Sequence, residues 1–160
     1  MSEVVPAIYA PPLRPIRLSL YGRVLALAIA AAASVLIITA WRLKPSPDGL
    51  GTHTEMGFYG CSLLTTTGVP CPSCGMTTSF SWFYRGNVLA SCYVQPMGCL
   101  LAFGVFATLL GAVYEALTGR PAHRLLRVLP VRRWLLAGVT VLAFAWAWKI
   151  MIHLSGRDGW

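Results

Sequence analysis

The chain has 160 residues, of which 56% are hydrophobic and only 11% are charged, and its formal net charge is +8. Soluble domains carry about 25% charged residues. The composition therefore excludes a disordered or acidic solvating protein and disfavours a water-soluble globule. The basic residues lie beside apolar stretches, which indicates orientation in a membrane rather than nucleic-acid binding. An integral membrane protein is predicted.

Three apolar segments are long enough to cross a bilayer as helices: residues 24–41, 96–117 and 134–152. A helix of about 18 residues rises about 27 Å, close to the hydrocarbon thickness of about 30 Å. The first segment exceeds the apolar part of a cleaved signal peptide, so we expect an uncleaved anchor. Lys149, near the end of the third segment, is expected to snorkel to the interface. In the second segment, Cys99 is expected to be a small packing residue.

Basic residues predict which loops face the cytoplasm. Eight Arg residues lie before the first span and in the loop 118–133, whereas the loop 42–93 and the carboxyl-terminal end hold four basic residues. The positive-inside tendency then makes the Arg-rich ends cytoplasmic and the cysteine loop 42–93 external. We expect residues 1–20 to be a disordered cytoplasmic tail, residues 21–154 a single membrane domain, and residues 155–160 an outer tail. The predicted location is the bacterial cytoplasmic membrane.

The chemically informative residues lie in the outer loop. Cys71 and Cys74 form a Cys-x-x-Cys pair, with Pro72 after the first cysteine and Gly75 after the second. If Cys71 caps a helix, Pro72 takes the first helical position, where its fixed φ is favourable. Both sulfurs would then lie near the positive end of the helix dipole, which favours thiolate.

This helix is predicted to run from Cys71 through Arg85 and to stop at Gly86. It is too short to span a bilayer, so an interfacial or re-entrant helix is expected. The predicted fold is therefore all-α, with three transmembrane helices and a short helix associated with a Cys-Pro-x-Cys-Gly turn.

Residues 65–96 resemble the bacterial membrane proteins catalogued as domain of unknown function 2752. That family has a Thr-Gly-x-x-Cys-Pro-x-Cys-Gly-x-Thr stretch, usually followed by Arg, and then Gly-Asp, Ala and Asn-Pro. The matching positions are Thr67, Gly68, Cys71, Pro72, Cys74, Gly75, Thr77, Gly86, Ala90 and Pro96. The structural motif is assigned to Pro72, Gly75, Thr77, Gly86 and Pro96. Thr78, Asn87 and Gln95 replace the usual Arg, Asp and Asn, so an Arg–Asp pair is missing. The resemblance implies the membrane topology and the site location, but no activity.

Three hypotheses for the cysteines stay open. In the first, Cys71 and Cys74 pack or form a disulfide that staples the turn, and the protein has a structural or partner-binding role. The expected partners are the lipid bilayer and another membrane protein, with no nucleic acid. This non-catalytic role is the function that we expect first.

The second hypothesis is thiol–disulfide chemistry, which would make the protein a thiol–disulfide oxidoreductase. Cys71 would attack a disulfide and Cys74 would resolve it, with Cys61 or Cys92 as a shuttling partner. No thioredoxin-like β-α-β pattern surrounds the pair, which counts against this hypothesis.

The third hypothesis is a metal site. A Cys-x-x-Cys pair supplies two of the four ligands that zinc requires. The candidates that would complete a site with Cys71 and Cys74 are Cys61, His53 and Cys92, and His153 is available because the third span also ends outside. A solvated His53 in a Gly-rich loop is the simpler interpretation for that residue. The pattern does not assign a cofactor. The metals with which it is compatible are zinc and iron.

Overall fold

The computed structural model describes residues 17–122 and 131–160, which form helices joined by turns and loops, without strands. Three helices are long and apolar enough to cross a membrane: α1 (Leu20–Arg42), α5 (Pro96–Thr118) and α6 (Val131–Leu154). The shorter ones are η1 (Thr52–Met56), α2 (Ser62–Thr67), α3 (Met76–Tyr84) and α4 (Val88–Val94). The predicted all-α class with three spans is confirmed. Most of the predicted tail and residues 123–130 of the Arg-rich loop lie outside the described residues.

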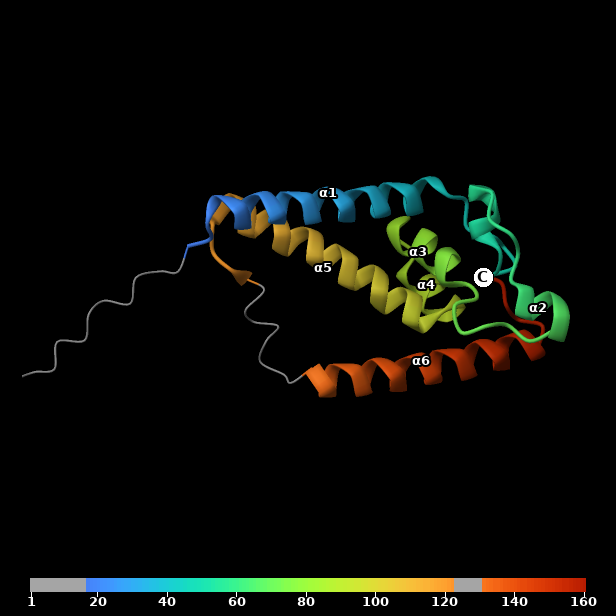
Figure 1. The fold of residues 1–160 in the computed structure, drawn as a ribbon. Coiled ribbons are helices and arrows are strands. Elements are labelled where there is room, and N and C mark those ends of the chain that lie inside the picture. Colours follow the sequence, from blue (N-terminus) through green and yellow to red (C-terminus); the bar gives the residue numbers. More distant parts are fainter. Residues whose placement is uncertain (1–16, 123–130) are drawn as a thin grey trace, which may run out of the picture.

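The long helices alternate in direction (Figure 1). α1 and α5 run antiparallel, and at their shared end the Leu18 N–H donates to the Gly119 carbonyl at 2.7 Å. The short helices α3 and α4 lie between α1 and α5 at the opposite end, where α6 and the chain terminus also arrive (Figure 1). The cysteine loop and the carboxyl terminus therefore share one end of the molecule.

Small side chains line the buried faces of α1 and α5. The residues buried along these two helices are Ala26, Ala30, Ala33 and Ala40 of α1 and Gly98, Cys99, Ala102 and Ala112 of α5. Small residues let helix backbones approach closely in a membrane, where lipid offers no hydrophobic drive for association. The large apolar side chains of both helices point outward, as lipid contact requires.

The short helix α3 begins later than predicted. Gly75 is its cap residue and has φ of +83°, so the helix starts at Met76 and not at Cys71. Cys71 and Cys74 belong instead to a turn that precedes the helix, in which the Cys74 N–H donates to the Cys71 carbonyl at 3.0 Å. The predicted placement of both sulfurs in a first helical turn is wrong, because the backbone reverses at Gly75 before it can continue as a helix.

The buried face of α3 is polar. Thr78, Ser79 and Ser81 are fully buried. The Ser79 hydroxyl donates to the carbonyls of Ser91 and Gln95, at the break between α4 and α5. Both carbonyls also accept backbone N–H groups, from Gln95 and Cys99, so the hydroxyl gives each a second hydrogen-bond partner at the break before Pro96. These bonds fix α3 against the start of α5.

Candidate functional site

The cysteine turn is held from both sides by hydrogen bonds to its prolines. The indole N–H of Trp146 on α6 donates to the Pro70 carbonyl at 2.9 Å. The Gln95 amide donates to the Pro72 carbonyl at 2.8 Å. Since these prolines flank Cys71, the cysteine is fixed between two rigid residues whose carbonyls are tied to other elements.

Gly75 completes the turn in a crowded place. Its φ of +83° favours glycine, and a Cβ there would lie 2.9 Å from the Gly49 carbonyl oxygen and 3.4 Å from Cε of Lys149. The motif positions Pro72 and Gly75 therefore shape the turn. Of the other motif residues, Gly86 ends α3 with φ of +87° and Pro96 is the first residue of α5.

A third cysteine joins the pair. Cys61 directly precedes α2, a short helix that stops at Gly68, and the chain then returns to Cys71. The sulfurs of Cys61, Cys71 and Cys74 all lie within 4.8 Å of one another, and those of Cys71 and Cys74 are 3.3 Å apart. None of the three is in a disulfide. We refer to Cys61, Cys71 and Cys74 as the cysteine trio.

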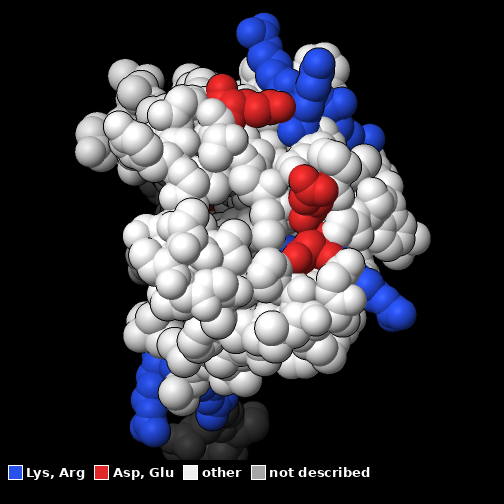
Figure 2. All heavy atoms as spheres, turned by 90° about the vertical axis from the view of Figure 1, so that its right-hand side faces the viewer, with Lys and Arg blue, Asp and Glu red and all other residues white. Residues whose placement is uncertain are grey.

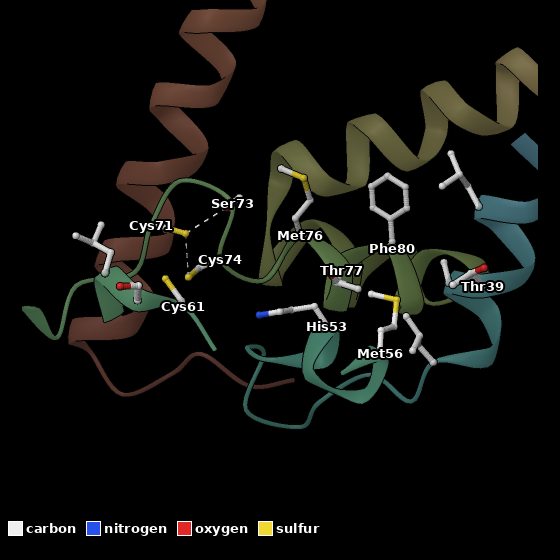
Figure 3. Close-up of a pocket in the computed structure, with 15 residues that line it drawn as sticks. Thr39, His53, Met56, Cys61, Cys71, Ser73, Cys74, Met76, Thr77 and Phe80 are labelled. Atoms are coloured by element: carbon white, nitrogen blue, oxygen red, sulfur yellow. Dashed lines mark hydrogen bonds between the residues drawn. The ribbon is translucent and has the colours of Figure 1, made fainter. Parts of the chain in front are cut away.

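The trio forms one end of a cavity of about 670 Å³ between α1, η1, α2 and α3. The other walls are mostly apolar: Leu36, Leu43, Met56, Leu63, Met76 and Phe80. Thr77, a motif residue, also lines it. Figure 3 shows the three sulfurs gathered together, with Met56 and Met76 farther along the cavity. Cys74 is buried, whereas Cys61 and Cys71 are partly accessible, so a ligand in the cavity can reach the sulfurs.

His53 lies in the same wall and points toward the trio (Figure 3). Its Nε2 is 3.1 Å from the Tyr59 carbonyl oxygen. A carbonyl only accepts, so this nitrogen carries the proton and donates. His53 thereby holds the segment that leads into Cys61. His53 is partly exposed, so it makes this bond while it remains open to solvent.

The surroundings of the Cys61 and Cys74 thiols give them different pKa values. Burial acts to raise the pKa of Cys61, but hydrogen bonds from the Leu64 backbone and from Cys74 and Cys71 favour its thiolate and lower the pKa to about 7. Burial and its two cysteine neighbours raise the pKa of Cys74. At neutral pH the trio therefore has one thiol that ionises readily beside one that holds its proton.

The other two cysteines are paired with each other. Cys92 at the end of α4 and Cys99 in the first turns of α5 form a disulfide, with a Cα–Cα distance of 5.1 Å. The expectation that Cys99 only packs is wrong. Cys92 is likewise removed as a metal ligand or a shuttling thiol for the trio. The break at Gln95 turns α4 relative to α5 and brings the two cysteines together.

Each of the three departures from the family pattern has a structural partner. The Thr78 hydroxyl lies 2.8 Å from that of Thr52, Asn87 caps α4 by accepting from the Ala90 N–H, and Gln95 holds the Pro72 carbonyl. The positioning role of Gln95 was not predicted from the sequence. Its signal was a polar residue directly before a helix-starting proline.

The carboxyl-terminal residues close over this end of the molecule. Figure 2 views this end directly and shows acidic and basic side chains on a largely uncharged surface. Lys149 is fully buried and its ammonium lies 2.9 Å from Oδ1 of Asp158. The other Asp158 oxygen meets Nδ1 of His153. An added Cβ at Gly49 would overlap the Asp158 backbone, so the tail packs directly on the loop. Lys149 does not snorkel, because the tail supplies its counter-charge inside the protein.

The fold and the site define a small helical membrane protein with three spans and a cysteine cluster at one end of the bundle. Residues 61–109 match the family described as Protein of unknown function (DUF2752), which agrees with the resemblance seen in the sequence and covers about a third of the chain. The match contains the whole trio and the first half of α5. Neither a curated protein nor a solved structure matches the chain.

Proposed function

We propose that the protein is a membrane protein that binds a soft or borderline transition-metal ion through Cys61, Cys71 and Cys74. The convergence of three free thiols from two separate segments is the observation that carries this proposal. Two sulfurs bound to one metal at about 2.3 Å in a tetrahedron lie about 3.8 Å apart. The 3.3 Å between the sulfurs of Cys71 and Cys74 is close to that value, and all three sulfurs lie within 4.8 Å of one another.

The chemistry of the trio supports metal binding better than a structural disulfide. A disulfide that staples the turn needs two cysteines, and Cys71 and Cys74 would suffice without Cys61. Metal ligands must be thiolates. The lowered pKa of Cys61 supplies one thiolate near neutral pH, and a bound cation would favour ionisation of the other two.

The proposed location is the bacterial cytoplasmic membrane with the trio on its outer side. The end opposite the trio carries Arg17, Arg23, Arg120, Arg132 and Arg133. A disulfide between Cys92 and Cys99 at the trio's end supports an oxidising compartment there. The proposed partner, besides lipid, is another membrane protein.

A second candidate is thiol–disulfide exchange, which the 3.3 Å contact between the sulfurs of Cys71 and Cys74 favours. If these two form a disulfide, the Cys61 thiolate attacks one of the sulfurs. A new disulfide forms with that cysteine, and the other cysteine leaves as a thiolate. In this scheme the Cys71–Cys74 disulfide forms without Cys61, and Cys61 is needed only to exchange it.

Metal binding by the full chain in detergent separates these functions. Reduced protein is offered Zn²⁺, Fe²⁺ and Cu⁺ in turn, without oxygen, and bound metal is measured by elemental analysis and chelator competition. We expect one tightly bound ion per chain. Serine at any trio position should lower the affinity at least about tenfold, since even outer-shell changes cost 10- to 100-fold. A Cys92→Ser, Cys99→Ser variant is the matched control and should bind as wild type does.

Two results would refute the metal function. One is a wild-type protein that takes up none of the three ions. The other is a Cys61→Ser variant that binds as tightly as wild type. In the second case a Cys71–Cys74 disulfide that forms normally and no longer exchanges would favour the redox candidate.

A further inference from the structure

We infer that the ion held by the cysteine trio is copper(I), bound by three thiolates, and that the thioethers of Met56 and Met76 guide it through the cavity. This inference rests on the proposed metal-binding function and goes beyond it by naming the metal. It is drawn from the number of ligands that the site offers and from the donor atoms that line the approach.

The trio supplies three ligands and not four. Among the described His, Cys, Asp and Glu side chains, only Cys61, Cys71 and Cys74 come within 4.8 Å of one another as a group. His53 points toward them, but it is not part of this group, although its Nδ1 keeps a free lone pair while Nε2 donates to the Tyr59 carbonyl. Structural zinc sites are almost always closed by four protein ligands. Three thiolates, with no fourth described His, Cys, Asp or Glu in the group, leave a structural zinc site incomplete, whereas copper(I) is selected by soft thiolates.

The cavity wall carries further soft donors. Met56 stands three residues after His53 in the 3₁₀ helix η1, where side chains at i and i+3 lie on the same side, and both line the cavity. Met76 begins α3, two residues after Cys74, and lines the cavity as well. Thioether sulfur is a soft ligand that suits copper(I) and does not suit magnesium or calcium.

The wall lacks the donors that hard cations need. No Asp, Glu, Lys or Arg is among the described residues that line the cavity. Between Thr39 at one end of the cavity and the trio at the other lie the thioethers of Met56 and Met76 (Figure 3). Each thiol that becomes a ligand releases its proton to water, so copper(I) with three thiolates leaves a complex of net charge −2. No electron is transferred in this step.

The test compares the affinities of the full chain for copper(I) and zinc under anaerobic conditions, with copper(I) supplied from a chromophoric chelator. We expect copper(I) to displace zinc from the wild type, and X-ray absorption to report three sulfur neighbours of copper and no nitrogen. His53→Gln retains an N–H donor for the Tyr59 carbonyl and removes the imidazole. This variant should bind copper(I) within about threefold of wild type.

The thioethers are tested by rate. A Met56→Leu, Met76→Leu variant keeps the size and apolar character of both side chains and removes only the sulfur. The matched control is Met97→Leu, Met151→Leu, because neither residue lines the cavity. We expect copper(I) transfer from the chelator to slow at least fivefold in the first variant, with little change in the control.

The possible results distinguish a failure of the proposed metal-binding function from a failure of the copper(I) inference or of the thioether role. If no metal binds, the proposed function itself fails. The copper(I) inference is overturned if zinc binds the trio more tightly than copper(I), or if His53→Gln loses tenfold or more in affinity, which would indicate a four-ligand site. Equal transfer rates in the two methionine variants would overturn the role of the thioethers.

Discussion

Neutralising Asp158 should destabilise the protein strongly. The Lys149 ammonium is fully buried, and its contacts are Asp158 at 2.9 Å and the Gly49 carbonyl at 3.5 Å. Asp158→Asn keeps the shape and leaves a buried cation without its counter-charge. Removing one partner of a buried pair costs about 3–5 kcal/mol. At about 2–4 °C per kcal/mol for a chain of this size, Tm should fall by roughly 6–20 °C.

A double-mutant cycle isolates the ion pair from other effects of the substitution. Lys149→Met removes the buried charge, so the combined Lys149→Met, Asp158→Asn variant should be less destabilised than the sum of the two single changes predicts. Asp48→Asn alters an exposed carboxylate of the same end and should change Tm little. Thermal unfolding in detergent, followed by circular dichroism, gives the Tm of wild type and of each of these variants.

Two outcomes would refute this reasoning. If Asp158→Asn melts at the same temperature as Asp48→Asn, the tail does not supply the counter-charge of Lys149. If the two single effects add without coupling, the loss comes from other contacts of the tail, such as the bond from the Tyr93 hydroxyl to the Arg157 carbonyl.

The remaining predictions concern the site. Gly75→Ala should cost about 1–3 kcal/mol of stability from its positive φ, and the new Cβ would also overlap the Gly49 carbonyl. Gly86→Ala has the same backbone strain, but its Cβ would enter open space. The Tm of Gly75→Ala should therefore be lower than that of Gly86→Ala. The pKa of Cys61 falls from 9.0 unfolded to about 7 folded, so its stabilisation is present above pH 9 and lost as pH falls through 7. The Tm advantage of metal-free wild type over Cys61→Ser should therefore shrink from pH 9 to pH 6. Trp146→Phe should lower stability by about 1 kcal/mol, through the lost bond to the Pro70 carbonyl.

Local patterns were enough to predict the spans and one boundary of α3. The apolar segments are long and lack charges, so their helices do not depend on which neighbours they meet. Gly86 ended α3 as predicted, since a glycine with positive φ stops a helix wherever it stands. The start of α3 was missed. Pro72 is compatible with both a first helical position and a turn, and only the packing of Gly75 against Gly49 decides between them.

The sequence by itself determined the membrane class, the three spans and the Cys-Pro-x-Cys-Gly turn, because length, hydropathy and backbone restrictions act over a few residues. Only the tertiary structure decided which cysteines meet. Cys61 and Cys92 were both candidates to join the pair, yet Cys61 joins it while Cys92 bonds to Cys99. The same holds for Lys149, whose partner lies in the folded-back tail. Such pairings depend on how distant segments pack, and no local spacing encodes them.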